Sequence, residues 1–309
     1  MRKLITTFIL IFSFFLSSQE TLFTLVDNSK TGINFSNELV DTKEHSIFLY
    51  ANYYGGAGVG IGDFDNDGLE DIFFAANLLD DKIYKNLGNF EFEDKTKMSG
   101  IINNGSWSTG VTVADVNNDG LLDIYVSCEL YDDAPVLRRN KLYINQGSFK
   151  FKESASEWGV DVDRRTRHSV FFDYNKDGLL DLYLLNHPPN TGNFSPFFGK
   201  DMSLPEYNLQ LFENKGNHFV DVTQSAGLSR SGFPNAAVIG DFNKDGWPDI
   251  YVANDFDSPD FLYFNNKDKT FTYATETSLR HTSFYSMGVD AADINNDSHL
   301  DLMVLDMTA

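Results

Sequence analysis

One nine-residue phrase occurs five times in this chain of 309 residues, and each copy is followed by a short apolar run. The phrase has Asp or Asn at positions 1, 3 and 5, Gly or Ser at position 6, and Asp at position 9. The copies begin at Asp63, Asp115, Asp173, Asp241 and Asp293. Their spacings of 52, 58, 68 and 52 residues indicate a repeat architecture, in which one small unit is used several times.

The phrase has the oxygen pattern of a calcium loop. Side-chain oxygens at positions 1, 3, 5 and 9, with the main-chain carbonyl of position 7, form the oxygen cage that Ca²⁺ prefers. Glycine at position 6 allows the tight turn that returns position 9 to the ion. We therefore predict about four to five structural calcium ions. The predicted ligand residues are Asp63, Asp65, Asp67, Leu69 and Asp71; Asp115, Asn117, Asp119, Leu121 and Asp123; Asp173, Asn175, Asp177, Leu179 and Asp181; Asp241, Asn243, Asp245, Trp247 and Asp249; and Asp293, Asn295, Asp297, His299 and Asp301.

The copies differ in two informative places. The first has carboxylates at all four side-chain positions, so it should hold Ca²⁺ more tightly than copies with Asn at position 3. The fifth has Ser298 in place of glycine, and a side chain is strained at positive φ. The fifth site is therefore predicted to be the weakest.

Two other interpretations of the phrase are less consistent with the sequence. An EF-hand needs a bidentate Glu at position 12 and flanking helices, whereas position 12 is apolar in every copy and β-type runs such as Asp123-Ile-Tyr-Val follow. Ordinary turns also use Asp, Asn and Gly, but a turn does not need the same four oxygen positions five times. The phrase predicts a metal loop that leads into a strand.

Each copy lies in a larger repeated unit. A β-type run such as Ala236–Gly240 precedes the phrase, a third run carries an aromatic residue and then Asn, as in Tyr143-Ile-Asn, and a fourth run begins with Phe. Four short strands per unit predict an all-β fold, a β-propeller of four-stranded blades. A β-sandwich does not predict the same turn chemistry in every unit. The units lie around residues 55–100, 107–160, 167–228 and 235–279, with an incomplete unit at 286–309.

The acidity of the chain belongs mainly to these loops. They hold 17 of its 45 acidic residues, and without those residues the net charge would be −4 instead of −21. Carboxylates crowded in this way repel one another without a cation, so metal binding and folding should be linked. Nucleic acid is not expected as a partner of such a chain.

The N-terminus has the pattern of an export signal. Met1-Arg2-Lys3 precedes 13 apolar residues, Leu4–Leu16, and small or polar residues follow. A transmembrane helix needs about 20 apolar residues, so we predict a signal peptide at 1–19, a mature propeller at 20–309 without a membrane span, and export to the periplasm, cell surface or medium. The single cysteine, Cys128, excludes an intrachain disulfide and is expected to be a small buried hydrophobe.

The repeated loops and strands resemble the FG-GAP/VCBS-repeat family, calcium-loop propellers that include the integrin α-subunit head. Phrases such as Trp107-Ser-Thr-Gly-Val and Phe171-Phe-Asp-Tyr-Asn-Lys-Asp-Gly are similar to bacterial secreted proteins resembling cartilage acidic protein. Those proteins commonly end in an ASPIC/UnbV domain, and no such segment follows the last unit here. The resemblance implies a binding or adhesion role; the fold itself does not define an activity.

The number of blades is open. Five units could close as a five-bladed ring, with residues 21–54 supplying a closing strand. Alternatively, the chain is the N-terminal part of a seven-bladed propeller, which we favour because the last unit lacks its outer strands and would leave an open sheet edge.

Strand direction alternates within a blade, so the calcium loops should share one face and the long connections the other. All arginines of the predicted mature chain fall in these connections, and arginine with aromatic residues is typical of recognition surfaces. Three of them, Arg164, Arg165 and Arg167, are expected in one blade-to-blade connection. Local pairing with nearby aspartates, for instance Asp132 or Asp161, is the alternative. The candidate ligand-face residues are Arg138, Arg139, Arg164, Arg165 and Arg167.

The function predicted from these observations is a non-enzymatic binding or adhesion module for a protein or an acidic glycan. The alternative is a propeller enzyme, a polysaccharide hydrolase or lyase, with acid–base groups at the mouth of the channel. His168 and His187 lie on or beside the ligand face, but neither has a metal or nucleophile partner evident in the sequence, so structural roles are expected.

Overall fold

Short strands pair into five antiparallel sheets in the computed structural model, which describes residues 22–50, 52–188, 205–256 and 258–307. Four sheets have four strands and the last has two. Within each sheet every strand pairs with its neighbour in the sequence, which is the up-and-down arrangement of a propeller blade. The predicted fold class is confirmed. The predicted signal peptide, residues 1–19, lies outside the described residues.

The five sheets are numbered here as blades one to five. Blade one has β1 (Val59–Gly62), β2 (Asp71–Phe74), β3 (Lys82–Asn86) and β4 (Phe92–Asp94). Blade two has β5 (Trp107–Ala114), β6 (Asp123–Glu129), β7 (Lys141–Asn145) and β8 (Phe151–Glu153). Blade three has β9 (Arg165–Phe172), β10 (Asp181–His187), β11 (Gln210–Asn214) and β12 (Phe219–Asp221). Blade four has β13 (Pro234–Gly240), β14 (Asp249–Asn254), β15 (Phe261–Asn265) and β16 (Phe271–Tyr273), and blade five has β17 (Ser286–Ala292) and β18 (Asp301–Asp306).

The helices are single turns between these strands. They are α1 (Asn28–Thr31), α2 (Thr96–Ser99), α3 (Ala155–Trp158), α4 (Thr275–Ser278) and the 3₁₀ turns η1 (Pro135–Arg138) and η2 (Pro205–Tyr207). Among the described residues, no helix combines the length and the apolar character needed to cross a membrane.

The first strands of the blades lie side by side and crowd one another. A Cβ on Gly58 would lie 2.7 Å from the main-chain nitrogen of Val111, and one on Gly110 would lie 2.7 Å from the carbonyl oxygen of Arg167. The neighbouring backbones therefore leave room only for glycine.

Apolar side chains fill the spaces between consecutive blades. Phe73 and Ile83 of blade one pack in one cluster with Ile124 of blade two, and Leu142 of blade two packs with Leu184 of blade three. Each fully buried side chain of this size stabilises the fold by about 1.5–3 kcal/mol. The lone cysteine, Cys128, is completely buried in the first of these clusters, as predicted.

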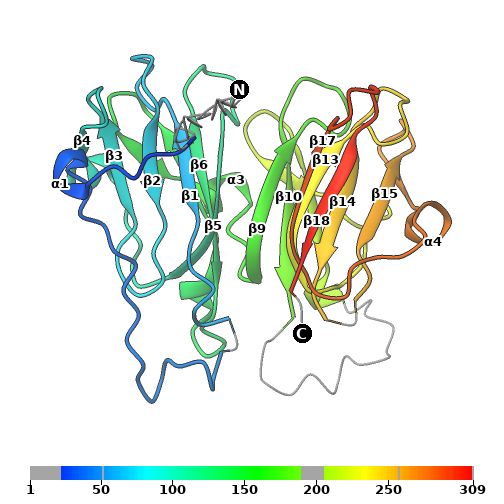
Figure 1. Ribbon diagram of the computed structural model, residues 1–309, viewed down its shortest axis with the longest axis horizontal. Coiled ribbons are helices and arrows are strands. Elements are labelled where there is room, and N and C mark those ends of the chain that lie inside the picture. The colour runs from blue at the N-terminus through cyan, green and yellow to red at the C-terminus, as the bar shows by residue number, and fades with distance from the viewer. Residues whose placement is uncertain (1–21, 51, 189–204, 257, 308–309) are drawn as a thin grey trace, which may run out of the picture.

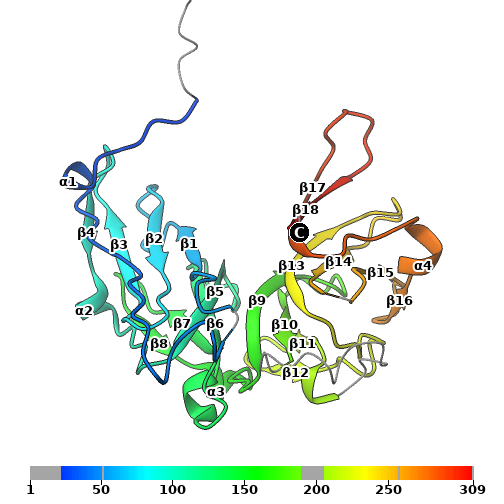
Figure 2. The same cartoon turned by 60° about the horizontal axis from the view of Figure 1, so that its bottom comes forward.

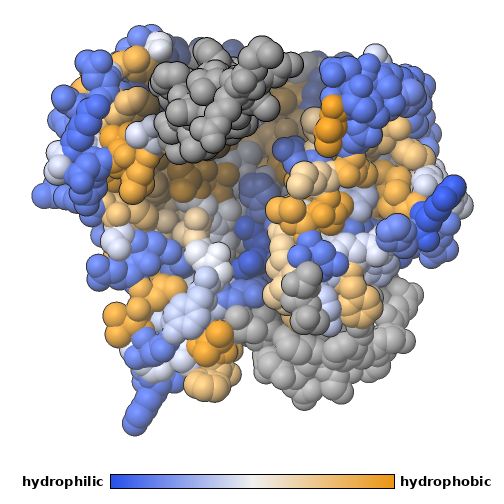
Figure 3. All heavy atoms as spheres, viewed as in Figure 1, coloured by the Kyte–Doolittle hydropathy of each residue, from blue (hydrophilic) through white to orange (hydrophobic). Residues whose placement is uncertain are grey.

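The blades form an open arc and do not close into a ring (Figure 2). Hydrophobic side chains gather on both sides of the hollow between its ends, over β1–β2 and over β17–β18 (Figure 3). Ile61 is 61% exposed at one end, and Met303 and Leu305 are each 57% exposed at the other. The two end blades thus each present a partly uncovered apolar flank.

The segment before blade one does not supply a closing strand. Within residues 22–50 and 52–54 the only regular element is α1. The segment instead runs along blade one, where Phe35 stacks on Phe74 with ring centroids 4.9 Å apart and Tyr84 donates a hydrogen bond to Asn34. The alternative of a five-bladed ring closed by a strand from this segment is therefore not supported by the described residues: side-chain packing, and not strand pairing, attaches the segment.

Candidate metal loops and the opposite face

The five acidic phrases form the connections between the first and second strands of the blades. We call them loops one to five, residues 63–71, 115–123, 173–181, 241–249 and 293–301. They lie together at the upper edge of the molecule in Figure 1, and the connections from second to third strands lie at the lower edge. These two surfaces are called the loop face and the connection face. Their separation follows the prediction from strand direction.

All five loops adopt one backbone conformation. Position 4 has positive φ in each, from 56° at Asn118 to 60° at Asn296, and position 6 is also left-handed. The position 1 carboxylate accepts hydrogen bonds from the N–H groups of positions 5 and 6, at 3.0 and 2.7 Å for Asp63. Ser298 keeps this arrangement, with φ of 65° and a 2.8 Å bond to Asp293. The missing glycine strains the fifth loop without changing its shape.

In loops one to four the position 9 carboxylate is buried inside its blade. Asp123 accepts from the N–H of Val116 at 3.0 Å and from that of Asn145 at 2.8 Å, and is 1% exposed. Burial raises the pKa of Asp71 to about 6 and the pKa values of Asp123 and Asp181 to about 7. A buried carboxylate of this kind is stabilised by a nearby cation.

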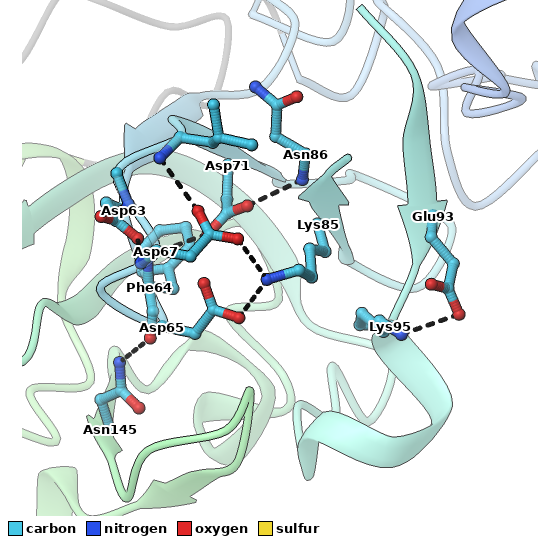
Figure 4. Close-up of polar contacts among 12 residues, drawn as sticks. Asp63, Phe64, Asp65, Asp67, Asp71, Lys85, Asn86, Glu93, Lys95 and Asn145 are labelled. Carbon is cyan, nitrogen blue, oxygen red and sulfur yellow. Dashed lines mark hydrogen bonds and ion pairs between the residues drawn. The ribbon is translucent and has the colours of Figure 1, made fainter. Parts of the chain in front are cut away.

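Loop one has the donor set that a calcium ion needs. Ligand oxygens of Asp63, Asp65 and Asp71 all lie within 4.8 Å of one another, and Figure 4 shows these side chains in the close-up of loop one. Oδ1 of Asp65 is buried and has no hydrogen-bond partner among the described residues. A buried acceptor without a donor is unfavourable, so this oxygen fits a cation. The residues present are compatible with the predicted ion.

In loops two to five an amide takes the place of Asp65. Asn117, Asn175, Asn243 and Asn295 each accept through Oδ1 from the position 5 N–H, at 2.9–3.0 Å. The position 7 residues also belong to the turn, since their N–H groups donate to the position 5 carboxylate, as His299 does to Asp297 at 2.8 Å. In loops two to five, hydrogen bonds thus link positions 3, 5 and 7, and among the described residues only loop one brings three carboxylates within 4.8 Å of one another.

Three further residue positions support the loops. The first is the Asn that ends each third strand, which the sequence pattern by itself indicates only as part of a turn. Asn145 donates to the carbonyl of Phe64 in loop one at 2.9 Å and to that of Leu122 at 3.0 Å. Asn214 and Asn265 make the same contacts one blade further on. The recurrence of Asn at the end of the third strand in the first four units was the signal that could have identified this role.

Neighbouring loops are also linked directly. In loops one to three the position 4 side chain reaches the position 6 carbonyl of the next loop: Asn66 donates to Gly120 at 3.0 Å and Asn118 to Gly178 at 3.2 Å, and Lys176 contacts Gly246. The remaining support comes from the residue before the third-strand Asn. Lys85 pairs with Asp65 and Asp67, whereas Glu213 accepts from Asn175 at 3.1 Å. Sequence reasoning missed these two because the position differs from blade to blade.

The candidate arginines of the connection face are engaged within the protein. Arg138 lies 2.6 Å from Asp132, Arg139 lies 2.8 Å from Asp161, Arg165 also pairs with Asp132, and Arg167 lies 3.1 Å from Glu129. Arg164 donates to the carbonyl of Asn208 at 3.0 Å. Local pairing, the alternative considered above, therefore describes four of the five. Nor do Arg164, Arg165 and Arg167 share one connection, because β9 begins at Arg165 and pairs it with His187.

A buried polar cluster lies behind these arginines. Glu129 is completely buried; it accepts from the Tyr50 hydroxyl at 2.5 Å and from Arg167, while its Oε1 has no partner among the described residues. The adjacent cation holds the pKa of Glu129 below its usual range despite burial. His187, next to this pair, is 2% exposed, and burial lowers its pKa to about 3. The cluster joins blades two and three to the N-terminal segment.

A pocket of about 430 Å³ opens on the connection face beside this cluster. Tyr50, Tyr131 and Arg165 line it, with Asp132 and His45. Leu130 and Tyr131 have positive φ, 68° and 41°. Such backbone strain in side-chain-bearing residues concentrates at binding sites.

The chain was compared with known proteins. Cartilage acidic protein 1 of Xenopus tropicalis is 25% identical over 164 residues, covering 52% of this chain and 24% of that protein. Phosphatidylinositol-glycan-specific phospholipase D of Bos taurus is 27% identical over 149 residues, covering 43% and 17%. The chain thus spans at most about a quarter of the length of these curated relatives.

Two solved structures show weaker similarity. A lectin of Agrocybe aegerita that recognises non-reducing terminal N-acetylglucosamine has a TM-score of 0.44 and 16% identity, covering 79% of this chain and 59% of its own. The biofilm matrix protein Bap1 of V. cholerae has a TM-score of 0.32 and 14% identity, covering 72% and 30%.

The family comparison coincides with the loops and strands described above. Residues 63–126, 202–252 and 241–304 match the FG-GAP-like repeat. These stretches contain loops one, two, four and five with the strands that follow them. The chain belongs to the FG-GAP-like repeat family.

Proposed function

We propose that this protein is an exported calcium-binding propeller that serves as a non-enzymatic binding module for a protein or glycan. The observation that supports calcium is the repeated loop, with its position 9 carboxylate buried in loops one to four and, in loop one, the unpartnered oxygen of Asp65. Bound calcium would supply positive charge among these carboxylates. Its role is structural, because the loops connect neighbouring blades and lie on the face opposite the pocket.

The ligand site is assigned to the pocket on the connection face. Tyr131 presents an aromatic ring at the pocket, and Arg165 and Asp132 supply hydrogen-bonding groups. Aromatic rings beside polar groups suit sugars and peptides, which have both apolar and hydrogen-bonding surfaces. Because Arg165 is already paired with Asp132, a neutral ligand suits this pocket as well as an acidic one.

A panel of neutral and acidic glycans, with a peptide library, tests the assignment. Tyr131→Ala should abolish the binding that the wild-type protein shows. Tyr54→Ala is the matched control, since this tyrosine is 57% exposed but does not line the pocket. Unchanged binding by the Tyr131 variant would place the ligand elsewhere.

A polysaccharide-cleaving enzyme is the second candidate. The observation that favours it is the buried pair Glu129 and His187. Oε1 of Glu129 and both ring nitrogens of His187 have no hydrogen-bond partner among the described residues. A carboxylate and an imidazole can serve as acid and base. Release of new reducing ends or unsaturated sugars, lost in Glu129→Gln, would support the enzyme. Glycan binding without turnover supports the binding module.

Export is proposed from the N-terminal sequence. Expression with the native N-terminus should yield an exported chain that begins after Gln19. An exported chain that retains Met1 would contradict the signal peptide.

A further inference from the structure

Loop one already contains a cation supplied by the protein. The Nζ atom of Lys85, on β3, contacts Oδ2 of Asp65 and lies 2.6 Å from Oδ2 of Asp67 (Figure 4). The lysine side chain is only 20% exposed. An ammonium held between two carboxylates and largely removed from water interacts with them strongly.

The equivalent position has a different residue in each of the four blades that have a third strand. This position is the residue immediately before the Asn that ends the third strand and contacts the position 9 carboxylate. The residues at this position are Lys85, Ile144, Glu213 and Phe264. Only loop one has a carboxylate at position 3, and only loop one faces a lysine at this place. The extra negative charge and the lysine therefore occur together.

Loop three shows the opposite arrangement. Glu213 accepts from the Asn175 amide at 3.1 Å and is itself paired with Lys215 at 2.7 Å and with Lys269. The third-strand residue thus contacts position 3 in both loops, as a cation in one and an anion in the other. Position 3 is the ligand position at which the charge of the loops varies.

We propose that Lys85 is an internal counter-ion of loop one. It neutralises the charge that Asp65 adds, holds the loop together without metal, and weakens calcium binding there. The two carboxylate oxygens of Asp65 then differ: Oδ2 contacts Lys85, while Oδ1 has no hydrogen-bond partner among the described residues. This inference rests on the proposed calcium binding. It reverses the sequence-based ranking, in which loop one was the tightest site, because the count of carboxylates omitted the lysine.

Calcium titration of the full chain, stripped with chelator and followed by calorimetry, tests the proposal. Lys85→Met should make one site tighter by about tenfold, because calcium affinity rises with the net negative charge of the loop. Adding Asp63→Asn should remove that tight site and so assign it to loop one. Lys85→Arg keeps the charge and should resemble the wild-type protein.

Lys82→Met is the matched control. Lys82 lies on the same strand and pairs with Asp94 at 3.1 Å, away from the loop, so its removal should not change calcium affinity. In chelator, Lys85→Met should melt at a lower temperature than Lys82→Met, since only loop one loses its counter-ion. If Lys85→Met does not fold in chelator, the calcium-loaded protein can be titrated against a chromophoric chelator, which reports the same fold-change.

The outcomes separate the two proposals. Calcium binding that Lys85→Met leaves unchanged or weakens overturns the role of Lys85, as does an equal effect of Lys85→Met and Lys85→Arg. A wild-type protein that binds no calcium overturns the proposed calcium function itself.

Discussion

At the scale of single residues, burial separates groups that look alike in the sequence. Arg139 and Arg167 are both paired arginines, yet the Arg139 side chain is 51% exposed, whereas Arg167 is 20% exposed and its partner Glu129 is fully buried. Exposed pairs contribute about 0–1 kcal/mol because water screens them. Removing one member of a buried pair leaves a charge without compensation.

Arg167→Ala should therefore destabilise the protein by about 3–5 kcal/mol, whereas Arg139→Ala should change stability by less than about 1 kcal/mol. Urea unfolding at neutral pH with calcium present measures both. Similar losses in the two variants would show that Glu129 finds another partner.

The buried His187 predicts a pH dependence. Its pKa in the folded protein is lowered to about 3 by burial, below the value of about 6.5 expected in the unfolded chain. The unfolded state therefore binds the proton first, and the stability associated with neutral His187 is present above pH 6.5 and lost as pH falls toward 3. The slope is up to about 1.4 kcal/mol per pH unit.

His187→Phe should flatten this dependence between pH 6.5 and 4 and cost little stability at pH 7, since neither ring nitrogen has a hydrogen-bond partner among the described residues. His218→Phe is the control, because His218 is exposed and should leave the slope unchanged. A His187→Phe protein with the wild-type slope would mean that other groups cause the acid sensitivity.

At the scale of elements, each blade is attached to the next through its third strand as well as through apolar packing. The Asn at the end of β7 satisfies the carbonyls of Phe64 and Leu122 and also accepts from Gly147 at 2.9 Å. One amide thus joins two loops and closes its own turn. This explains why the same residue recurs at the end of β3, β7, β11 and β15.

Asn145→Ala should destabilise the protein by about 1–3 kcal/mol, the range for leaving buried polar groups unsatisfied. Gln146→Ala, at the next residue, is the control and should be near neutral, because the Gln146 amide contacts only adjacent carbonyls at 3.3–3.5 Å. Denaturant titration with saturating calcium compares them. Equal stability would show that packing alone holds the blades together.

At the scale of the whole molecule, the loop face concentrates negative charge along one edge of the arc. Hydrogen bonds from the side chains of one loop to the main-chain carbonyls of the next hold these charges close together in the folded state. An ion that binds only the folded loops stabilises the whole arc by mass action, by about 2.7 kcal/mol per site at 100 times the dissociation constant.

Calcium should accordingly raise the melting temperature of the chelator-treated protein, and equal Mg²⁺ should have little effect because Mg²⁺ demands a smaller, octahedral site. Differential scanning calorimetry at constant ionic strength measures the shift. Identical melting in calcium and chelator would refute structural calcium.

The sequence by itself determined the repeat, the order of the strands and the shape of the acidic loops. These features are local: the N–H groups of positions 5 and 6 donate to position 1 within five residues, and short runs rich in β-branched and aromatic residues specify the strands. For the same reason the loop face could be predicted, since it follows from the alternation of strand direction along the chain.

The tertiary structure decided what depends on residues distant in sequence. The pairing of Arg167 with Glu129 and Tyr50 spans 38 and 117 positions, and the contact of Asn145 with Phe64 spans 81. Lys85, on β3, reaches Asp65 in the loop between β1 and β2 across 20 positions. Composition gives the charge of such residues but not their burial or their interaction partners. Burial and partners decide whether an arginine is free to bind a ligand. They also decide how strongly a loop attracts a cation.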